Sequence, residues 1–129
     1  MAQDIREKIM EFEKQRQALI NVTMQKQQLQ ALVNGLEKSL EEIERTKETN
    51  VYKAAGNILV LREKGEVKKE LADQKETSSI RLKSVEKQEE SLVQKLNTLR
   101  SQIESDAAQG AAQIRSNDQT VKSSDANKP

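Results

Sequence analysis

The sequence predicts a mainly α-helical protein: a long antiparallel two-helix coiled coil with a single β-hairpin at the connection and a disordered C-terminal tail. Three observations lead to this fold class. One third of the 129 residues are charged, whereas the chain has one Phe, one Tyr and no Trp, too little large apolar surface for a compact globular core. Apolar residues recur at helical spacing on both sides of a short central stretch. That stretch, residues 50–66, contains the Tyr and the only run of four consecutive aliphatic residues.

The first helix is expected at about residues 3–46. Its apolar residues recur in steps of three and four, the spacing typical of the seam of a coiled coil, the row of positions at which one helix faces the other. Two successive steps of three, ending at Val22, predict a local overwinding of the supercoil. The apolar seam residues are Ile5, Ile9, Phe12, Leu19, Val22, Leu29, Val33, Leu36, Leu40 and Ile43.

The middle of this helix has an unusual composition, with many Gln and no acidic residue between Gln15 and Leu36. Two interpretations stay open. The Gln-rich face is either a solvated, weakly packed surface, or an uncharged surface that presents little repulsion to varied partners.

A β-hairpin is expected at about residues 50–63, after a turn-forming stretch at residues 46–50. Two β-prone runs, residues 51–55 and 58–61, are separated by Gly56 and Asn57. Gly at the first of two turn positions favours a type II′ turn, in which only that position needs a positive φ.

The two faces of this hairpin differ in polarity. The turn pairs Ala54 with Leu59 and Tyr52 with Leu61, which makes one face largely apolar and the other mixed. A lone two-stranded hairpin is marginal in water, and its open edges invite further pairing. It therefore either packs back onto its own helices or, as we favour, pairs with hairpins of other subunits. The expected oligomerisation residues are Val51, Tyr52, Ile58, Leu59, Val60 and Leu61.

The second helix is expected at about residues 66–106, with Gly65 as the exit from the hairpin. Polar seam residues predict loose pairing near the hairpin and tighter pairing from Leu92 onward. An antiparallel pair sets Ile43 near Val67 and brings both ends of the pair to a far tip. Residues 107–129 are polar and are expected to form a flexible tail. The seam residues are Leu71, Lys75, Ser78, Leu82, Val85, Glu89, Leu92, Leu96, Leu99 and Ile103.

Composition argues against several classes of function. The net charge is +1, from 22 basic and 21 acidic residues, and both signs occur throughout the two long segments, so no nucleic-acid partner is expected. The chain has no Cys and no His, and nucleotide-binding and metalloprotease motifs are absent. The acidic cluster at residues 41–44 is interpreted as a solvated helix face. We therefore expect no enzymatic activity, no catalytic residues, no metal and no cofactor.

The chain is also expected to be cytoplasmic and to have no membrane partner. Its first residues, MAQDIREKIM, are charged and lack the apolar region of a secretory signal. No apolar run approaches the ~20 residues of a membrane span.

The motif VYKxxGNxLV between two long helices resembles the β-class subunits of prefoldin, the archaeal form above all. Here it reads VYKAAGNILV, residues 51–60. Residues 69–71, Arg81, residues 87–90 and Leu92 are also similar to the second helix of that family. The resemblance covers roughly residues 5–105, and the hairpin motif is fairly specific.

This resemblance implies a hetero-hexamer of α-class and β-class subunits, in which the hairpins form a platform and the coiled coils hang from it. It implies an ATP-independent chaperone (holdase) that captures unfolded proteins at the coiled-coil tips and delivers them to a group II chaperonin. The expected client-binding residues at the tip are Ile5, Ile9, Met10, Phe12 and Ile103, with Met10, off the seam, as the best candidate for exposure. For Ile5, Ile9 and Phe12 a second interpretation stays open, that they only complete the coiled coil.

One alternative function is a structural coiled-coil adaptor or scaffold without client-holding activity. It predicts a parallel dimer or trimer that does not depend on the hairpin. A nucleic-acid-binding coiled coil is disfavoured by the balanced charge.

Overall fold

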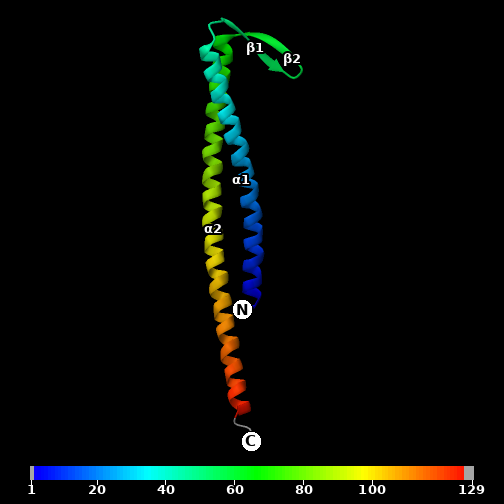
Figure 1. Cartoon of the computed structure of the whole chain (residues 1–129), viewed down its shortest axis with the longest axis vertical. Coiled ribbons are helices and arrows are strands. Elements are labelled where there is room, and N and C mark those ends of the chain that lie inside the picture. Colours follow the sequence, from blue (N-terminus) through cyan, green and yellow to red (C-terminus); the bar gives the residue numbers. More distant parts are fainter. Residues whose placement is uncertain (1, 127–129) are drawn as a thin grey trace. The chain divides into compact units, whose positions relative to one another are not determined.

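The computed structural model describes residues 2–126, and side chains for residues 5–111. Four elements follow one another: helix α1 (Ala2–Arg45), strand β1 (Asn50–Ala55), strand β2 (Ile58–Glu63) and helix α2 (Lys64–Ala126), as Figure 1 shows. This order confirms the predicted fold of two long helices with a hairpin between them. The chain divides into two units, residues 21–89 and residues 1–20 with 90–129, which are described in turn.

The hairpin belongs to the unit formed by residues 21–89. Strands β1 and β2 pair antiparallel, with Tyr52 opposite Leu61 and Ala54 opposite Leu59, which confirms the predicted register. Gly56 has a φ of +62°, and no other residue in the described part of the chain has a positive φ. This is the pattern expected for a type II′ turn.

In the same unit, the α1 segment from residue 21 runs antiparallel to the first part of α2. Lys26 lies 2.8 Å from Glu89 near one end, and Glu44 forms an ion pair with Lys68 near the other. The buried apolar side chains between the helices are Val33, Leu36, Ile43 and Val67. Ile43 and Val67 line one groove, as expected from the predicted pairing.

The seam near the hairpin is not as loose as the sequence suggested. Among the side chains of residues 5–111, four of the five buried apolar ones lie in this unit, and Ser78 is buried as well. The charged seam residues find partners on the other helix: Lys75 lies 3.6 Å from Glu37, and Glu89 pairs with Lys26. Both residues are half-buried and have their charges paired, so a charged residue at the seam weakens the helix pair less than expected.

The second unit pairs the start of α1 with the later part of α2. Lys8 Nζ lies 2.6 Å from Asp106 Oδ2, and Phe12 and Leu19 lie beside residues 93–100, so the two segments run antiparallel here too. Leu96 is buried, and a hollow beside it is lined by Phe12, Leu19 and Val93.

Helix α2 extends further at both ends than the sequence predicted. It begins at Lys64, so Gly65 lies in its first turn and is not a separate exit from the hairpin. It continues to Ala126, beyond the expected end near residue 106. Four Ala residues lie within three positions of Gly110, and extending an existing helix is easier than starting one, which offsets a single Gly. That residues 107–129 are flexible in solution stays a prediction, and residues 127–129 lie outside the described part.

Candidate assembly and client-binding sites

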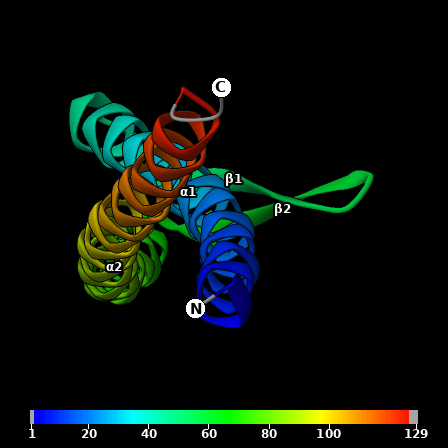
Figure 2. The same ribbon diagram turned by 90° about the horizontal axis from the view of Figure 1, so that it is seen from below.

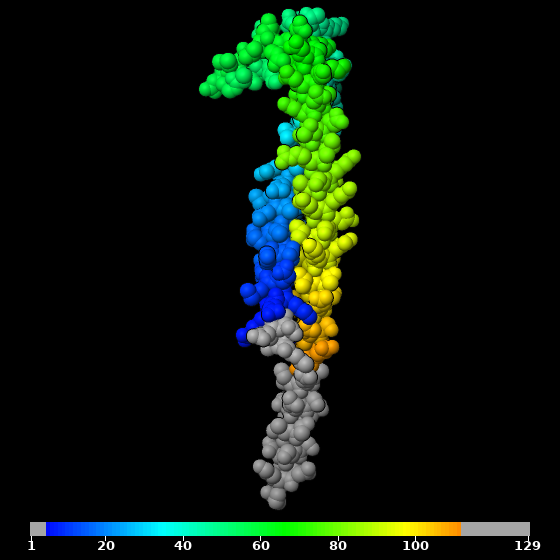
Figure 3. All heavy atoms as spheres, turned by 180° about the vertical axis from the view of Figure 1, so that it is seen from behind, coloured from blue at the N-terminus to red at the C-terminus, as the bar shows by residue number. Residues whose placement is uncertain are grey.

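The hairpin stands out from the helices of its unit with most of its surface uncovered. Figure 2 shows the strands reaching to one side of the helices, and Figure 3 shows the same projection with all atoms drawn. Three of its strand residues are half-buried, namely Val51, Lys53 and Arg62, and the others are exposed. They share one face, because Val51 lies opposite Arg62 and alternate residues of a strand point to the same side.

The other face carries the largest exposed apolar side chains of the hairpin. Tyr52 is 71% exposed, and Leu59 and Leu61 beside it are exposed as well. Ile58 and Val60 are exposed on the mixed face. Five of the six residues predicted for oligomerisation are therefore exposed, and the sixth, Val51, is half-buried. A contiguous exposed apolar surface of this kind is typical of a protein–protein contact.

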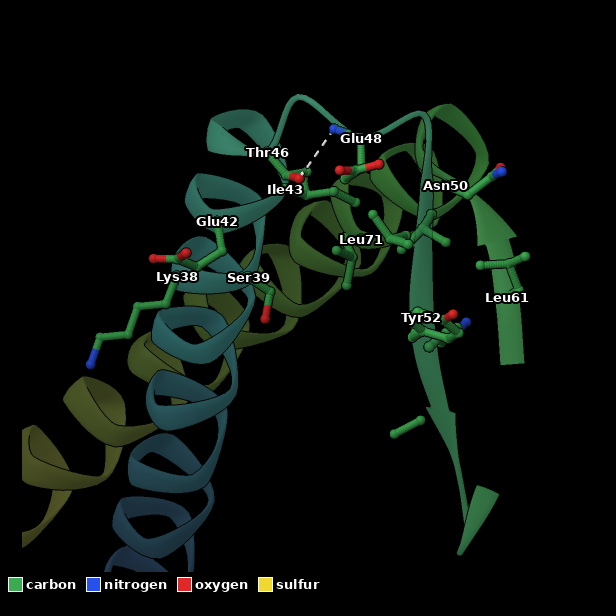
Figure 4. A pocket seen from close by; sticks show the side chains of 14 residues that line it. Lys38, Ser39, Glu42, Ile43, Thr46, Glu48, Asn50, Tyr52, Leu61 and Leu71 are labelled. Carbon is green, nitrogen blue, oxygen red and sulfur yellow. Dashed lines mark hydrogen bonds between the residues drawn. The ribbon is translucent and has the colours of Figure 1, made fainter. Parts of the chain in front are cut away.

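A groove separates the hairpin from the end of α1. It is an open hollow of about 820 Å³. In Figure 4, Tyr52 and Leu61 lie on the strand side, Lys38 and Ser39 on the α1 side, and Ile43 near the junction of the two. Its rim mixes Lys and Glu side chains, and no cluster of metal-ligating residues occurs among the residues described. Ile43, Val67 and Leu71 give the groove an apolar lining on the helix side, which suits a contact with another apolar surface.

One carboxylate connects the hairpin to helix α2. Glu70 accepts a hydrogen bond of 2.6 Å from Lys53 of β1 and another of 2.6 Å from Arg62 of β2. These two bonds, Lys53 first, lower the pKa of Glu70 from 4.5 to about 2. Sequence reasoning did not identify this contact. The predicted register places Lys53 and Arg62 on the same face of the hairpin, but nothing in the sequence places Glu70 beside them.

A second polar contact crosses the seam further along. Glu89 accepts hydrogen bonds from Lys26 Nζ at 2.8 Å and from the Thr23 hydroxyl at 2.9 Å. Both bonds lower the pKa of Glu89, the one from Lys26 more. An interhelical carboxylate with two donors fixes the register of the helices, since sliding either helix by one turn breaks both bonds.

The predicted client-binding residues all lie in the unit that contains the N-terminal part of α1. Ile9 and Met10 are exposed, Met10 to 72%. Ile5, Phe12 and Ile103 are half-buried. The exposure of Met10 agrees with its position off the seam. The sequence-based prediction did not include Val93, which is also exposed near Phe12.

Comparison with known proteins places these features in a family. The family model for prefoldin subunits matches residues 6–110, which include most of both helices and the whole hairpin. The chain belongs to the prefoldin family. It is 43% identical to the prefoldin subunit beta of Archaeoglobus fulgidus over 91 residues, which cover 70% of this chain and 76% of the relative. It is 37% identical to the prefoldin subunit beta of Thermococcus onnurineus over 95 residues, covering 73% and 82% of the two chains.

A solved structure agrees with this assignment. The crystal structure of the prefoldin beta subunit from Thermococcus strain KS-1 superposes with a TM-score of 0.73 and 34% identity, covering 79% of this chain and 90% of that one. The resemblance to archaeal β-class prefoldin subunits is thus confirmed. The family is one of chaperone subunits that form hetero-oligomers, not of known enzymes. Within the described residues, no helix has a stretch both long and apolar enough to span a bilayer.

Proposed function

We propose that this chain is a β-class subunit of a cytoplasmic hetero-hexameric prefoldin, which holds unfolded proteins without ATP and delivers them to a group II chaperonin. Its partners are an α-class subunit, further β subunits, the unfolded clients and the chaperonin. The exposed apolar face of the hairpin, with Tyr52, Leu59 and Leu61, carries this proposal. Burying such a face requires other chains, because this chain's own helices leave it open.

The energetics of an unpaired hairpin favour assembly through the hairpins of several subunits. A two-stranded hairpin has two unpaired edges, and each large apolar side chain gains about 1.5–3 kcal/mol when it is buried. Pairing with a neighbouring hairpin satisfies the open edge and covers the apolar face in the same step. The hairpins thereby become the platform of the particle.

Client holding belongs to the tip. Met10 and Ile9 offer adaptable apolar surface, and Met suits the binding of many different segments because its side chain is flexible and polarisable. Ile5, Phe12 and Ile103 add further apolar surface when the helix pair frays. These contacts need no nucleotide chemistry.

The assembly step is tested by placing an Asp on the exposed apolar face of the hairpin. Leu59 in the hairpin and Ile80 in α2 are 69% and 62% exposed, so Ile80→Asp controls for adding a charge at an exposed apolar site. With an α-class partner, the wild type and Ile80→Asp should form a hexamer by native mass spectrometry, and Leu59→Asp should not. A structural adaptor would keep its oligomeric state in all three cases.

Holding is tested separately on hexamers that have formed. Met10→Ser with Ile9→Ser should assemble but lose most of the suppression of aggregation of a denatured protein. Met24, 54% exposed elsewhere on α1, provides the control Met24→Ser, which should hold clients as the wild type does. A hexamer that never suppresses aggregation without ATP would contradict the holdase function.

A further inference from the structure

We propose that Glu70 is a positioning residue for assembly: by binding Lys53 and Arg62 together, it holds the hairpin at one orientation on α2 and so decides which face the neighbouring subunits meet. The role in assembly rests on the function proposed above. The clamp formed by Glu70, Lys53 and Arg62, which we call the Glu70 clamp, can be tested on this chain alone.

The base of the hairpin is already fixed by the backbone. Strand β2 passes directly into α2 at Lys64, and the Lys64 amide donates to the carbonyl of Thr49 at 2.9 Å. The Lys64 ammonium group also donates to the carbonyl of Thr46 at 2.8 Å, next to the end of α1. These contacts hold the base of the hairpin, and none of them involves its outer part.

The Glu70 clamp acts beyond this base and joins three elements. Glu70 Oε2 receives Lys53 Nζ from β1, and Oε1 receives Arg62 Nη2 from β2, both at 2.6 Å. Each carboxylate oxygen thus binds one strand, and both bonds are short and charge-assisted. Because the two strands are themselves paired, this single side chain restrains the hairpin as one rigid ribbon against α2.

Apolar packing supplies little of this restraint, because Val51 is the one half-buried apolar residue of the two strands. The half-buried residues of the hairpin are Val51, Lys53 and Arg62, so two of the three are the partners of Glu70. Partly exposed ion pairs contribute little to global stability. Where so little else fixes the orientation, however, a small energy is enough to select one arrangement. With the mixed face held toward α2, Tyr52, Leu59 and Leu61 remain uncovered.

Glu66 provides a natural comparison. It lies one turn before Glu70 and reaches Arg62 at 3.4 Å, but it is more exposed and no ion pair links it to Lys53. It therefore touches only β2 and should not restrain both strands. The low pKa of Glu70 fits the same geometry, since its carboxylate stays charged well below the usual range of a Glu.

The absence of Cys from the sequence allows a direct test by site-specific spin labelling. Labels at Asn57→Cys in the turn and Lys83→Cys on α2 report the distance between hairpin and helix by pulsed electron paramagnetic resonance. The full chain should give one narrow distance distribution. Glu70→Ala should broaden it, Glu66→Ala should leave it unchanged, and the inverted set Glu70→Lys, Lys53→Glu and Arg62→Glu should narrow it again. An unchanged distribution in Glu70→Ala overturns the clamp.

Assembly is then measured with the same variants and an α-class partner. Glu70→Ala should raise the dissociation constant about fivefold, the value of two partly exposed ion pairs, and Glu66→Ala should not. If Glu70→Ala broadens the distribution but assembles like the wild type, the role in presenting the face is wrong. If the wild type itself never assembles, the proposed function fails, while the labelling result still decides the clamp.

Discussion

Two leucines on the same helix give a sharp test of how the helix pair is held together. Leu36 is 7% exposed and Leu32 is 50% exposed, and both lie in the interior of α1. Changing either to Ala removes an isopropyl group and gains the same small amount of helix propensity. The difference between the two variants therefore measures burial alone.

The magnitudes follow from the exposed fractions. At about 0.8 kcal/mol per buried methylene, Leu36→Ala loses about 2 kcal/mol of transfer free energy, and a cavity contribution raises this to about 2.5 kcal/mol. Leu32→Ala loses about 1 kcal/mol and leaves no closed cavity, because the site is open to water. The expected difference in the free energy of unfolding is about 1.5 kcal/mol.

Urea unfolding followed by far-ultraviolet circular dichroism measures this difference, and it is repeated at several protein concentrations to separate folding from association. Both variants should keep the wild-type dependence on urea, so that only the midpoint moves. Equal losses at the two positions would refute the reasoning, since they would mean that Leu36 and Leu32 are buried alike in solution.

Two further predictions concern the turn and the charges. No atom lies within 4 Å of a Cβ built on Gly56 or on Gly35, so backbone conformation alone decides the effect of a change to Ala. Gly56→Ala should destabilise the hairpin by about 1 kcal/mol because Gly56 has a positive φ, and the labelling distances check this. Gly35→Ala should stabilise α1 by about 1 kcal/mol because Ala favours a helix over Gly, and the urea midpoint checks this. The pKa values of Glu44, Glu70 and Glu89 are lowered by Lys68, by Lys53 with Arg62, and by Lys26 with Thr23. A carboxyl group whose pKa in the folded chain lies below its unfolded value of 4.5 stabilises the protein above pH 4.5, and this contribution is lost as the pH falls. The urea midpoint should therefore drop between about pH 4.5 and pH 2. In Glu89→Gln the drop should be less steep, because one of these carboxyl groups is missing.

The features that follow from local rules could be predicted from the sequence. Gly56 and Asn57 specify the turn, and this turn then determines which residues face one another across the two strands. Helical spacing specifies which residues form the seam, and Leu36, Ile43 and Leu96 are buried there. The exposure of the hairpin also follows, because the chain has too few apolar residues to cover it.

The features that depend on three-dimensional arrangement could not be predicted in the same way. The contact of Glu70 with Lys53 and Arg62 depends on the angle between the hairpin and α2, which no spacing in the sequence encodes. The polar seam residues were interpreted as weak points, because the sequence does not show that Lys75 faces Glu37 or that Glu89 faces Lys26. The end of α2 was placed too early, because Gly110 received more weight than the Ala residues beside it.

The narrow core and the exposed hairpin have a common consequence for stability. A helix pair with few buried side chains has a low free energy of unfolding. The hairpin does not raise this free energy by itself, because Tyr52, Leu59 and Leu61 are exposed. A partner that binds this face binds the folded chain and not the unfolded one, so it must raise the apparent stability of the subunit by mass action. The Glu70 clamp strengthens this linkage, because a hairpin already held at the binding orientation loses less conformational entropy when the partner arrives. The proposed function therefore predicts that folding of the subunit and assembly of the particle are coupled through the same short hairpin.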